Sequence, residues 1–180
     1  MKSRDRIENE LLVLKCQMGD TKAFEELVNR WQKRLWRHAY QLTGDRDTAW
    51  DAVQDTWVAI VKGMRRLQAA GAFPRWAYRI LSARCADCMR KRQRQRKLSD
   101  RLAVEANSAE DTCADVHDSL KGALARLPGE RRALLGLRYA EGYSTGEIAE
   151  ILGVPEGTVK SRLYHAREQL RRLMEGRSDE

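Results

Sequence analysis

The sequence predicts an all-α protein of two small helical domains joined by an acidic flexible linker. Apolar residues recur at spacings of three and four along the chain, and no segment alternates like a strand. Charge divides the chain into three blocks: residues 1–97 carry 22 basic and 11 acidic side chains, 98–116 carry 1 and 5, and 117–180 carry 11 and 10. All five tryptophans lie in the first block. We therefore expect domains at 1–97 and 117–180, with the linker at 98–116.

Four helices are expected in the first domain. They are 7–18, 22–43, a helix with an apolar stripe from Trp50 to Leu67, and one that opens at Phe73-Pro74 and runs into RKRQRQRK. Gly44 lies where a helix ends in a left-handed turn, and Asp45 can cap the next helix. Proline suits the first turn of a helix, which places the start of the fourth helix at Pro74. The linker has room for one short helix at 98–106.

The second domain is expected to contain four helices: 120–127, 131–140, 145–152 and 155–173. Ser144 and Glu147 have the spacing of a capping box, and Gly153 falls at a turn where positive φ is expected. A short helix, a tight turn and a second helix form the helix-turn-helix that presents a helix to a DNA major groove. A plain helical hairpin with a solvated basic face is the alternative.

The last helix has a predicted inner stripe of Val159, Leu163 and Ala166, with Arg162 near its buried edge. The residues expected to meet DNA are Gly157, Thr158, Lys160, Ser161, Arg162, Tyr164, His165 and Arg167. Cationic side chains supply contacts to phosphates, and Gly157 lets the start of the helix approach the backbone of DNA.

The fourth helix carries a second cationic surface, which runs from Arg75 to Lys97 and indicates nucleic-acid binding. Trp76 and Tyr78 stand at its start, where aromatic rings could stack on unpaired bases. The alternative is a solvated helix end with core aromatics, and the spacing of Trp76 and Ile80 favours a core position for Trp76.

Four cysteines are too few for a secreted disulfide scaffold, so we expect reduced thiols. Cys85 and Cys88 form a C-x-x-C, but the three histidines have no spacing that would complete a zinc site. Buried small apolar residues are the better interpretation, with His38 structural and His165 exposed.

Five segments together resemble the ECF (extracytoplasmic-function) sigma factors of bacterial RNA polymerase. They are GDTKAFEELVNRW at 19–31, DAVQDTWVAIVK at 51–62, FPRWAYRI at 73–80, the D-x-x-R pattern at 87–90, and LPGERRALLGLRYAEGYSTGEIAEILGVPEGTVKSRLYHAREQLRRL at 127–173. The resemblance covers about residues 11–173. Two positions depart from the family: Ala83 stands where Asn is usual, and Ala77 where Leu is usual. Ser82 and Arg84 are the polar neighbours that remain for the role of that Asn.

The resemblance implies a sigma factor that binds core RNA polymerase through its clamp and flap regions, directs it to promoters and helps to open promoter DNA. The first domain would bind the minus-ten element and the second the minus-thirty-five element. Minus-ten residues implied are Trp76, Arg79, Arg84, Asp87, Arg90 and Lys91, and the polymerase-binding residues are Asp51, Gln54 and Asp55. An anti-sigma factor is a further expected partner.

No enzymatic activity, cofactor or metal is implied, and the polymerase itself would perform the chemistry. The charged N-terminus and the lack of a long apolar run predict a cytoplasmic protein without membrane insertion. Two other classes remain: a helix-turn-helix activator or repressor, and a thiol redox enzyme. The first needs a dimerising or sensing domain, and the second a strand before the C-x-x-C.

Overall fold

The computed structural model describes residues 3–99 and 119–175, and every regular element in these ranges is helical. The first range contains α1 (Ser3–Gln17), α2 (Thr21–Thr43), α3 (Arg46–Gly63), the short helices Met64–Arg66 and Ala70–Ala72, and α4 (Phe73–Ser99). The second contains α5 (Ser119–Ala125), α6 (Gly129–Leu135), a π turn at Gly136–Ala140, α7 (Thr145–Leu152) and α8 (Glu156–Glu175). The expected helix at 98–106 falls largely, and Cys113 wholly, outside the described residues.

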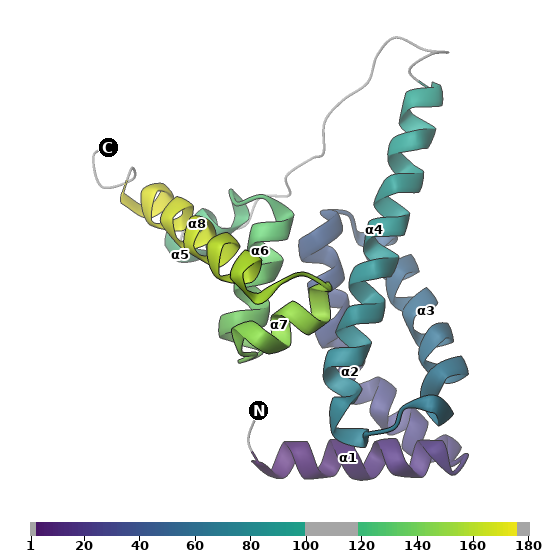
Figure 1. The fold of residues 1–180 in the computed structure, drawn as a ribbon. Helices are drawn as coiled ribbons and strands as arrows, with labels where there is room; N and C mark the ends of the chain where they lie inside the picture. Colours follow the sequence, from purple (N-terminus) through teal and green to yellow (C-terminus); the bar gives the residue numbers. More distant parts are fainter. Residues whose placement is uncertain (1–2, 100–118, 176–180) are drawn as a thin grey trace.

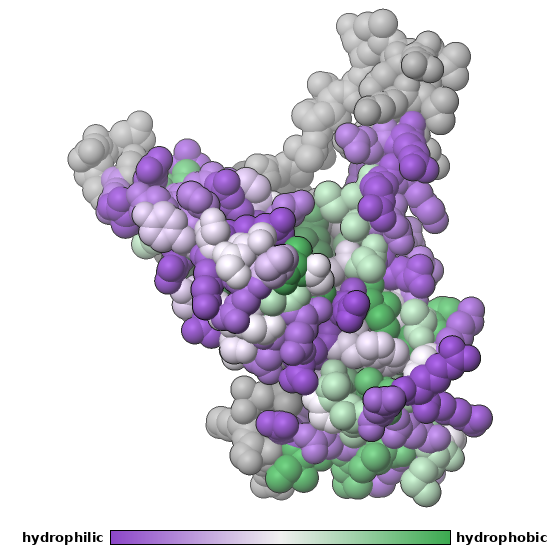
Figure 2. Space-filling model, in the orientation of Figure 1, coloured by the Kyte–Doolittle hydropathy of each residue, from purple (hydrophilic) through white to green (hydrophobic). Residues whose placement is uncertain are grey.

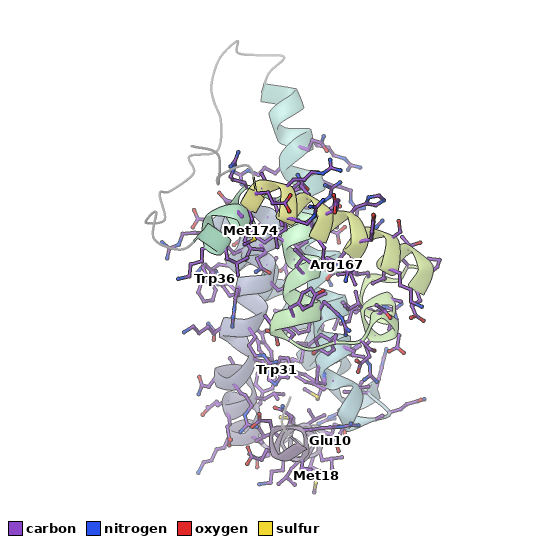
Figure 3. All side chains as sticks on the ribbon, turned by 90° about the vertical axis from the view of Figure 1, so that its left-hand side faces the viewer. Glu10, Met18, Trp31, Trp36, Arg167 and Met174 are labelled. Atoms are coloured by element: carbon purple, nitrogen blue, oxygen red, sulfur yellow. The ribbon has the colours of Figure 1, made fainter. Side chains whose placement is uncertain are left out.

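Helices α2, α3 and α4 run side by side, and α1 lies across one end of this group (Figure 1). Their core is aromatic: the ring of Trp31 meets those of Phe73 and Tyr78 edge to face, at centroid distances of 5.6 and 6.2 Å. All three side chains are fully buried, and Trp31 lies inside the group in Figure 3. Edge-to-face packing adds to the free energy gained from burying these large rings.

The helix ends follow the local sequence signals. Asp20 accepts a hydrogen bond from the backbone N–H of Ala23, and Asp45 accepts one from Thr48, so each carboxylate caps a helix. Gly44 has a φ of 67°, as expected of a left-handed helix stop.

Trp50 is a correction to the predicted apolar stripe, because it is 37% exposed. It lies near the start of α3, where its ring packs beside Trp36 at 5.9 Å and not in the core.

The second domain packs α5 and α6 on α8, and α7 on α8. The predicted helix at 131–140 exists in two parts, since α6 ends at Leu135 and continues as the π turn. The two domains are in contact: α4 packs against α7, and α2 packs against α6 (Figure 1). At 27 residues, α4 is about 40 Å long, and its C-terminal turns stand clear of the other described helices (Figure 1).

Candidate nucleic-acid interface

Helices α7 and α8 form the predicted helix-turn-helix. The N–H of Glu147 donates to Ser144 Oγ at 3.2 Å, and the N–H of Ser144 donates to Glu147 Oε2 at 2.9 Å, which confirms the capping box. Gly153 ends α7 with a φ of 65°, and its N–H donates to the carbonyl of Ala149. The turn therefore has the geometry that its sequence predicts.

One face of α8 is buried and the opposite face is open. Val159, Leu163 and Ala166 are buried, as predicted. The exposed residues of the other face are Gly157, Lys160, Ser161, Arg162, Tyr164, His165 and Arg167. Thr158 is half-buried. Arg162 is exposed and lies next to the buried stripe, one helical turn from Val159 and Ala166; Arg167 lies on the same helix in Figure 3.

Lys160 is paired within its own helix. Its Nζ lies 3.0 Å from Glu156 Oε1, and Thr145 Oγ1 donates to the same carboxylate oxygen at 2.7 Å. The hydrogen bond from Thr145, with that from Lys160, lowers the pKa of Glu156 below its ordinary value. Exposed pairs of this kind are worth little, so Lys160 remains available to a phosphate.

The cationic residues of α4 face solvent beyond the first turn. Arg79, Arg90 and Lys91 are exposed, and Arg84 is half-buried. Arg90 donates to Asp87 Oδ1 at 2.5 Å, one helical turn away, and this hydrogen bond lowers the pKa of Asp87. The D-x-x-R pattern is therefore an ion pair, in which Asp87 orients Arg90.

The expected aromatic stacking surface is wrong for Tyr78. Tyr78 is fully buried against Trp31 and against His38, whose ring centroid lies 5.1 Å away. The reason is helical phase, since Tyr78, Leu81 and Cys85 are spaced by three and four and form the inner stripe of α4. Trp76 is half-buried, so only part of its surface could meet a base.

A cleft of about 740 Å³ separates α4 from the second domain. Arg79 and Ala83 line it from the first domain, and Arg162 and His165 line it from α8. Residues from both predicted DNA-binding surfaces therefore face one cleft. Figure 2 shows hydrophilic atoms over the second domain and the outer part of α4, with hydrophobic atoms between them.

The predicted polymerase-binding residues lie together on α3. Asp51, Gln54 and Asp55 are exposed, opposite the buried Val53 and Ile60. Neither carboxylate forms a salt bridge with another described residue, so both charges are open to a partner.

The cysteines behave mainly as apolar residues. Cys85 is buried, and burial raises the pKa of its thiol to about 12, while Cys16 and Cys88 are half-buried. Among the described residues, no group of three or more His, Cys, Asp or Glu side chains could hold a metal ion. None of the described helices is both long and apolar enough to cross a membrane.

Sequence reasoning missed the contacts between the domains. Arg75 Nη1 lies 3.2 Å from Glu147 Oε1, and its Nε lies 3.0 Å from Glu150 Oε2. Arg34 pairs with Glu141. Burial of the guanidinium lowers the pKa of Arg34, but the hydrogen bond and charge of Glu141, together with nearby Tyr78 and Tyr143, leave this pKa raised. The partners are 72 or more residues apart in the chain, and no local pattern reports such pairs.

Two protein-family models match the chain. "Sigma-70 region 2" matches residues 27–95, and "Sigma-70, region 4" matches residues 117–170.

Similar curated proteins carry related names. "ECF RNA polymerase sigma factor SigM" of Mycobacterium tuberculosis is 33% identical over 172 residues, covering 94% of the chain and 86% of the relative. "ECF RNA polymerase sigma factor SigE" of Mycolicibacterium smegmatis is 35% identical over 168 residues, covering 88% of the chain. The chain spans 64% of the length of this second relative.

Two solved structures share the fold. One is the sigma factor RpoE in complex with the anti-sigma factor NepR from Bartonella quintana, with a TM-score of 0.68, 29% identity, and coverage of 86% of this chain and 98% of that chain. The other is CnrH in complex with the cytosolic domain of CnrY, with a TM-score of 0.66, 25% identity, and coverage of 94% and 98%.

Proposed function

Because the chain belongs to the ECF RNA polymerase sigma factors, we propose that it binds core RNA polymerase, directs it to specific promoters and assists promoter melting. One observation carries this proposal: sigma-70 regions 2 and 4 match one chain in that order. Region 2 spans α2 to α4, and region 4 spans α5 to α8. Neither a lone activator nor a thiol redox enzyme requires this pair of regions.

In this proposal the second domain reads the minus-thirty-five element. The exposed face of α8 enters the major groove, where an arginine can contact guanine O6 and N7 together. Arg162 is the base reader in this proposal, since its guanidinium is exposed at the edge of that face. Lys160 meets phosphate, which adds affinity but little sequence information.

The first domain takes the minus-ten element along α4. Arg79, Arg90 and Lys91 supply phosphate contacts, and Trp76 offers the exposed part of its ring to an unstacked base. Capturing such bases offsets the cost of unpairing and so favours melting. Tyr78 has no part in this, because it is buried. With Ala83 in place of the usual Asn, Arg84 is the polar neighbour that contacts the strand.

Asp51, Gln54 and Asp55 form the contact with the polymerase clamp. The two carboxylates lie one turn apart on an open helix face, which suits a basic partner surface. The second domain would reach the flap region. The chain itself performs no catalysis and needs no cofactor, and its place of action is the cytoplasm, where core polymerase meets the promoter.

An anti-sigma factor is a further proposed partner. The two similar solved structures contain such a partner or the cytosolic domain of another protein. By analogy, a protein inhibitor would hold this chain away from polymerase until a signal releases it.

Transcription in vitro tests the proposal. Purified chain and core polymerase should together give promoter-specific transcripts from a genomic DNA library, and neither should do so alone. A chain that binds DNA in a defined sequence but never co-purifies with core polymerase would instead be a stand-alone regulator.

A further inference from the structure

Helix α1 carries an exposed apolar stripe along its outer face. Its members, with their exposed fractions, are Ile7 (64%), Leu11 (52%), Leu14 (50%) and Met18 (87%). They are spaced by four, three and four residues, so they fall within ~60° of the helix circumference. The opposite face carries the buried Asn9, Leu12 and Val13, through which α1 packs on the first domain.

This α1 stripe faces away from the other described helices. Helix α1 lies across the end of α2, α3 and α4, and hydrophobic atoms appear at that end of the molecule (Figures 1 and 2). Met18 lies at the same end in Figure 3. None of the residues expected to bind polymerase or DNA belongs to α1. Monomeric surfaces carry scattered single apolar residues, whereas a continuous row of four large ones indicates a partner.

The spacing of the α1 stripe matches the a and d positions of a coiled coil. Ile7 and Leu14 take d positions, and Leu11 and Met18 take a positions. In an antiparallel pair of α1 helices, Leu11 would pack on Leu14 of the second copy, and Ile7 on Met18 of the second copy. Every member of the stripe then meets an apolar counterpart, and leucine meets leucine in both central layers.

The charges on one side of the stripe are complementary to themselves in this register. Glu8 and Lys15 lie on that side, at positions that face each other between antiparallel helices. Glu8 would meet Lys15 of the second copy, and two-fold symmetry would repeat the pair. Lys15 is exposed and has no salt-bridge partner among the described residues. Arg30 Nη2 lies 3.0 Å from Glu8 Oε2, and the side chain of Glu8 remains 41% exposed.

The other side of the stripe is already engaged within the chain. Glu10 pairs with Arg6 at 3.0 Å, and Gln17 donates to two backbone carbonyls between α3 and α4 at 3.0 and 2.7 Å. A parallel pair of α1 helices would require Glu10 to leave Arg6 for Lys15 of the second copy. The antiparallel pair uses only the side of Glu8 and Lys15, so the charges favour it.

We propose that the chain forms a homodimer through antiparallel contact of its α1 stripes. Because α1 is already packed on its own domain, association does not have to order this helix. A single pair of 15-residue helices is a small interface, below the ~1,200 Å² of a standard one. The dimer should therefore be weak, with a Kd of ~10–100 µM.

Sedimentation equilibrium of the full chain is the direct test. Between ~5 and ~300 µM, the average mass of wild type should rise from 20.7 kDa toward twice that value. Leu11→Glu combined with Leu14→Glu should remain at the mass of one chain, because it places like charges in both central layers. The matched control is Val58→Glu combined with Val61→Glu on α3. These valines are 52% and 56% exposed and the change in charge is the same, so the control should dimerise like wild type.

Exchange of charges tests the register. Lys15→Glu should raise the Kd of the dimer several-fold, because it replaces two contacts of opposite charge with two of like charge. Adding Glu8→Lys should restore the wild-type Kd, since each pair is then rebuilt with its signs reversed. Circular dichroism confirms that each variant is folded. A folded double variant that dimerises no better than Lys15→Glu would overturn the antiparallel contact.

A constant mass of 20.7 kDa for wild type up to ~300 µM would overturn the proposal. A dimer that survives Leu11→Glu combined with Leu14→Glu would do the same. If the chain is monomeric but co-sediments with phosphatidylcholine vesicles, and this double variant does not, the stripe contacts lipid and not a second copy. These measurements use the chain without polymerase or DNA, so their outcome is independent of the proposed function.

Discussion

Trp31 Nε1 donates a hydrogen bond of 3.1 Å to Asn9 Oδ1, and both side chains are buried. The bond joins α1 to α2 over 22 residues of sequence, at the point where α1 crosses the end of the helical group. An indole N–H has no second way to be satisfied in an apolar core. This polar contact therefore fixes where α1 docks.

Asn9→Ala should lower the free energy of unfolding by ~1–3 kcal/mol, because it leaves the indole N–H of Trp31 buried without its acceptor. Urea denaturation followed by tryptophan fluorescence measures the change. Ile7→Ala is the control on the same helix, because Ile7 is 64% exposed and should matter little. Equal effects of the two substitutions would show that the hydrogen bond does not hold α1.

Asp51→Arg combined with Asp55→Arg should weaken the binding of core polymerase without unfolding the chain. Both residues are exposed on α3, so larger side chains fit, and charge reversal would oppose a basic clamp surface. Affinity for core polymerase is measured by titration of labelled chain. Glu25→Arg combined with Glu26→Arg, two exposed acids of α2, changes the net charge by the same amount and provides the charge-matched comparison. An unchanged affinity of the double variant would remove this face from the polymerase contact.

Arg162→Ala should relax the preference at one or two base pairs of the minus-thirty-five element. A bidentate contact between arginine and guanine is worth ~1–3 kcal/mol of discrimination, and its loss falls on particular positions. Transcription from a set of promoter variants shows which positions lose their effect. If folded Arg162→Ala loses activity equally on every variant, Arg162 is not a base reader.

Lys160→Ala should instead weaken DNA binding for all sequences and reduce its dependence on salt. The exposed ammonium of Lys160 suits a phosphate contact, and its partner Glu156 holds it only weakly. Binding measured at several salt concentrations gives the slope. A slope equal to that of wild type would mean that Lys160 releases no counterion and stays paired with Glu156.

Stability should rise with pH between about 4 and 6.5, because of His38. Burial lowers the pKa of His38 to about 4 from an ordinary value of 6.5. Between these values the unfolded chain binds a proton that the folded chain does not, so acid favours unfolding. The contribution is about 3 kcal/mol, and it is complete above pH 6.5 and lost as the pH falls toward 4.

His38→Gln should flatten this part of the profile, since glutamine does not titrate. Urea unfolding at pH 4, 5, 6 and 7 measures the difference between the two chains. The carboxylates titrate in both and so cancel in the comparison. Parallel profiles for wild type and His38→Gln would show that His38 is solvated or protonated in the folded state.

Helix ends and buried stripes could be predicted because their causes are local. Gly44, Gly153 and the capping box of Ser144 act through backbone groups within a few residues, and the sequence shows all of them. Trp50 was misassigned because periodicity does not say where a neighbouring helix stops covering a stripe. The stacking role expected of Tyr78 is wrong because it rested on the position of Tyr78 at the start of the cationic surface, whereas its helical phase with Leu81 indicates the core.

The contacts between the domains could not be predicted at all. Arg75 and Glu150 look like ordinary solvated charges in their own helices, and nothing nearby in the sequence shows that they meet. The sequence around Gly129 likewise gives no sign of the contact, because the lack of a side chain at Gly129 matters only when α2 lies against α6. Such contacts depend on how the two folded domains pack against each other, and the helix propensity of each segment carries no information on that packing.

The side of α4 on which its last residues lie depends on how many residues the helix contains. Each residue turns an α-helix by about 100° and advances it by ~1.5 Å. Arg92 Nη1 lies 3.1 Å from Asp45 Oδ2, which ties this part of α4 to the start of α3. Two residues inserted after Arg92 would rotate all later residues about the helix axis by about 200°. Seven inserted residues would move the later residues ~10 Å along the helix axis and return them to almost the same side of the helix. The exposed Arg94 would therefore return to its original side of α4 only after the seven-residue insertion, so DNA binding along α4 should tolerate seven inserted residues better than two.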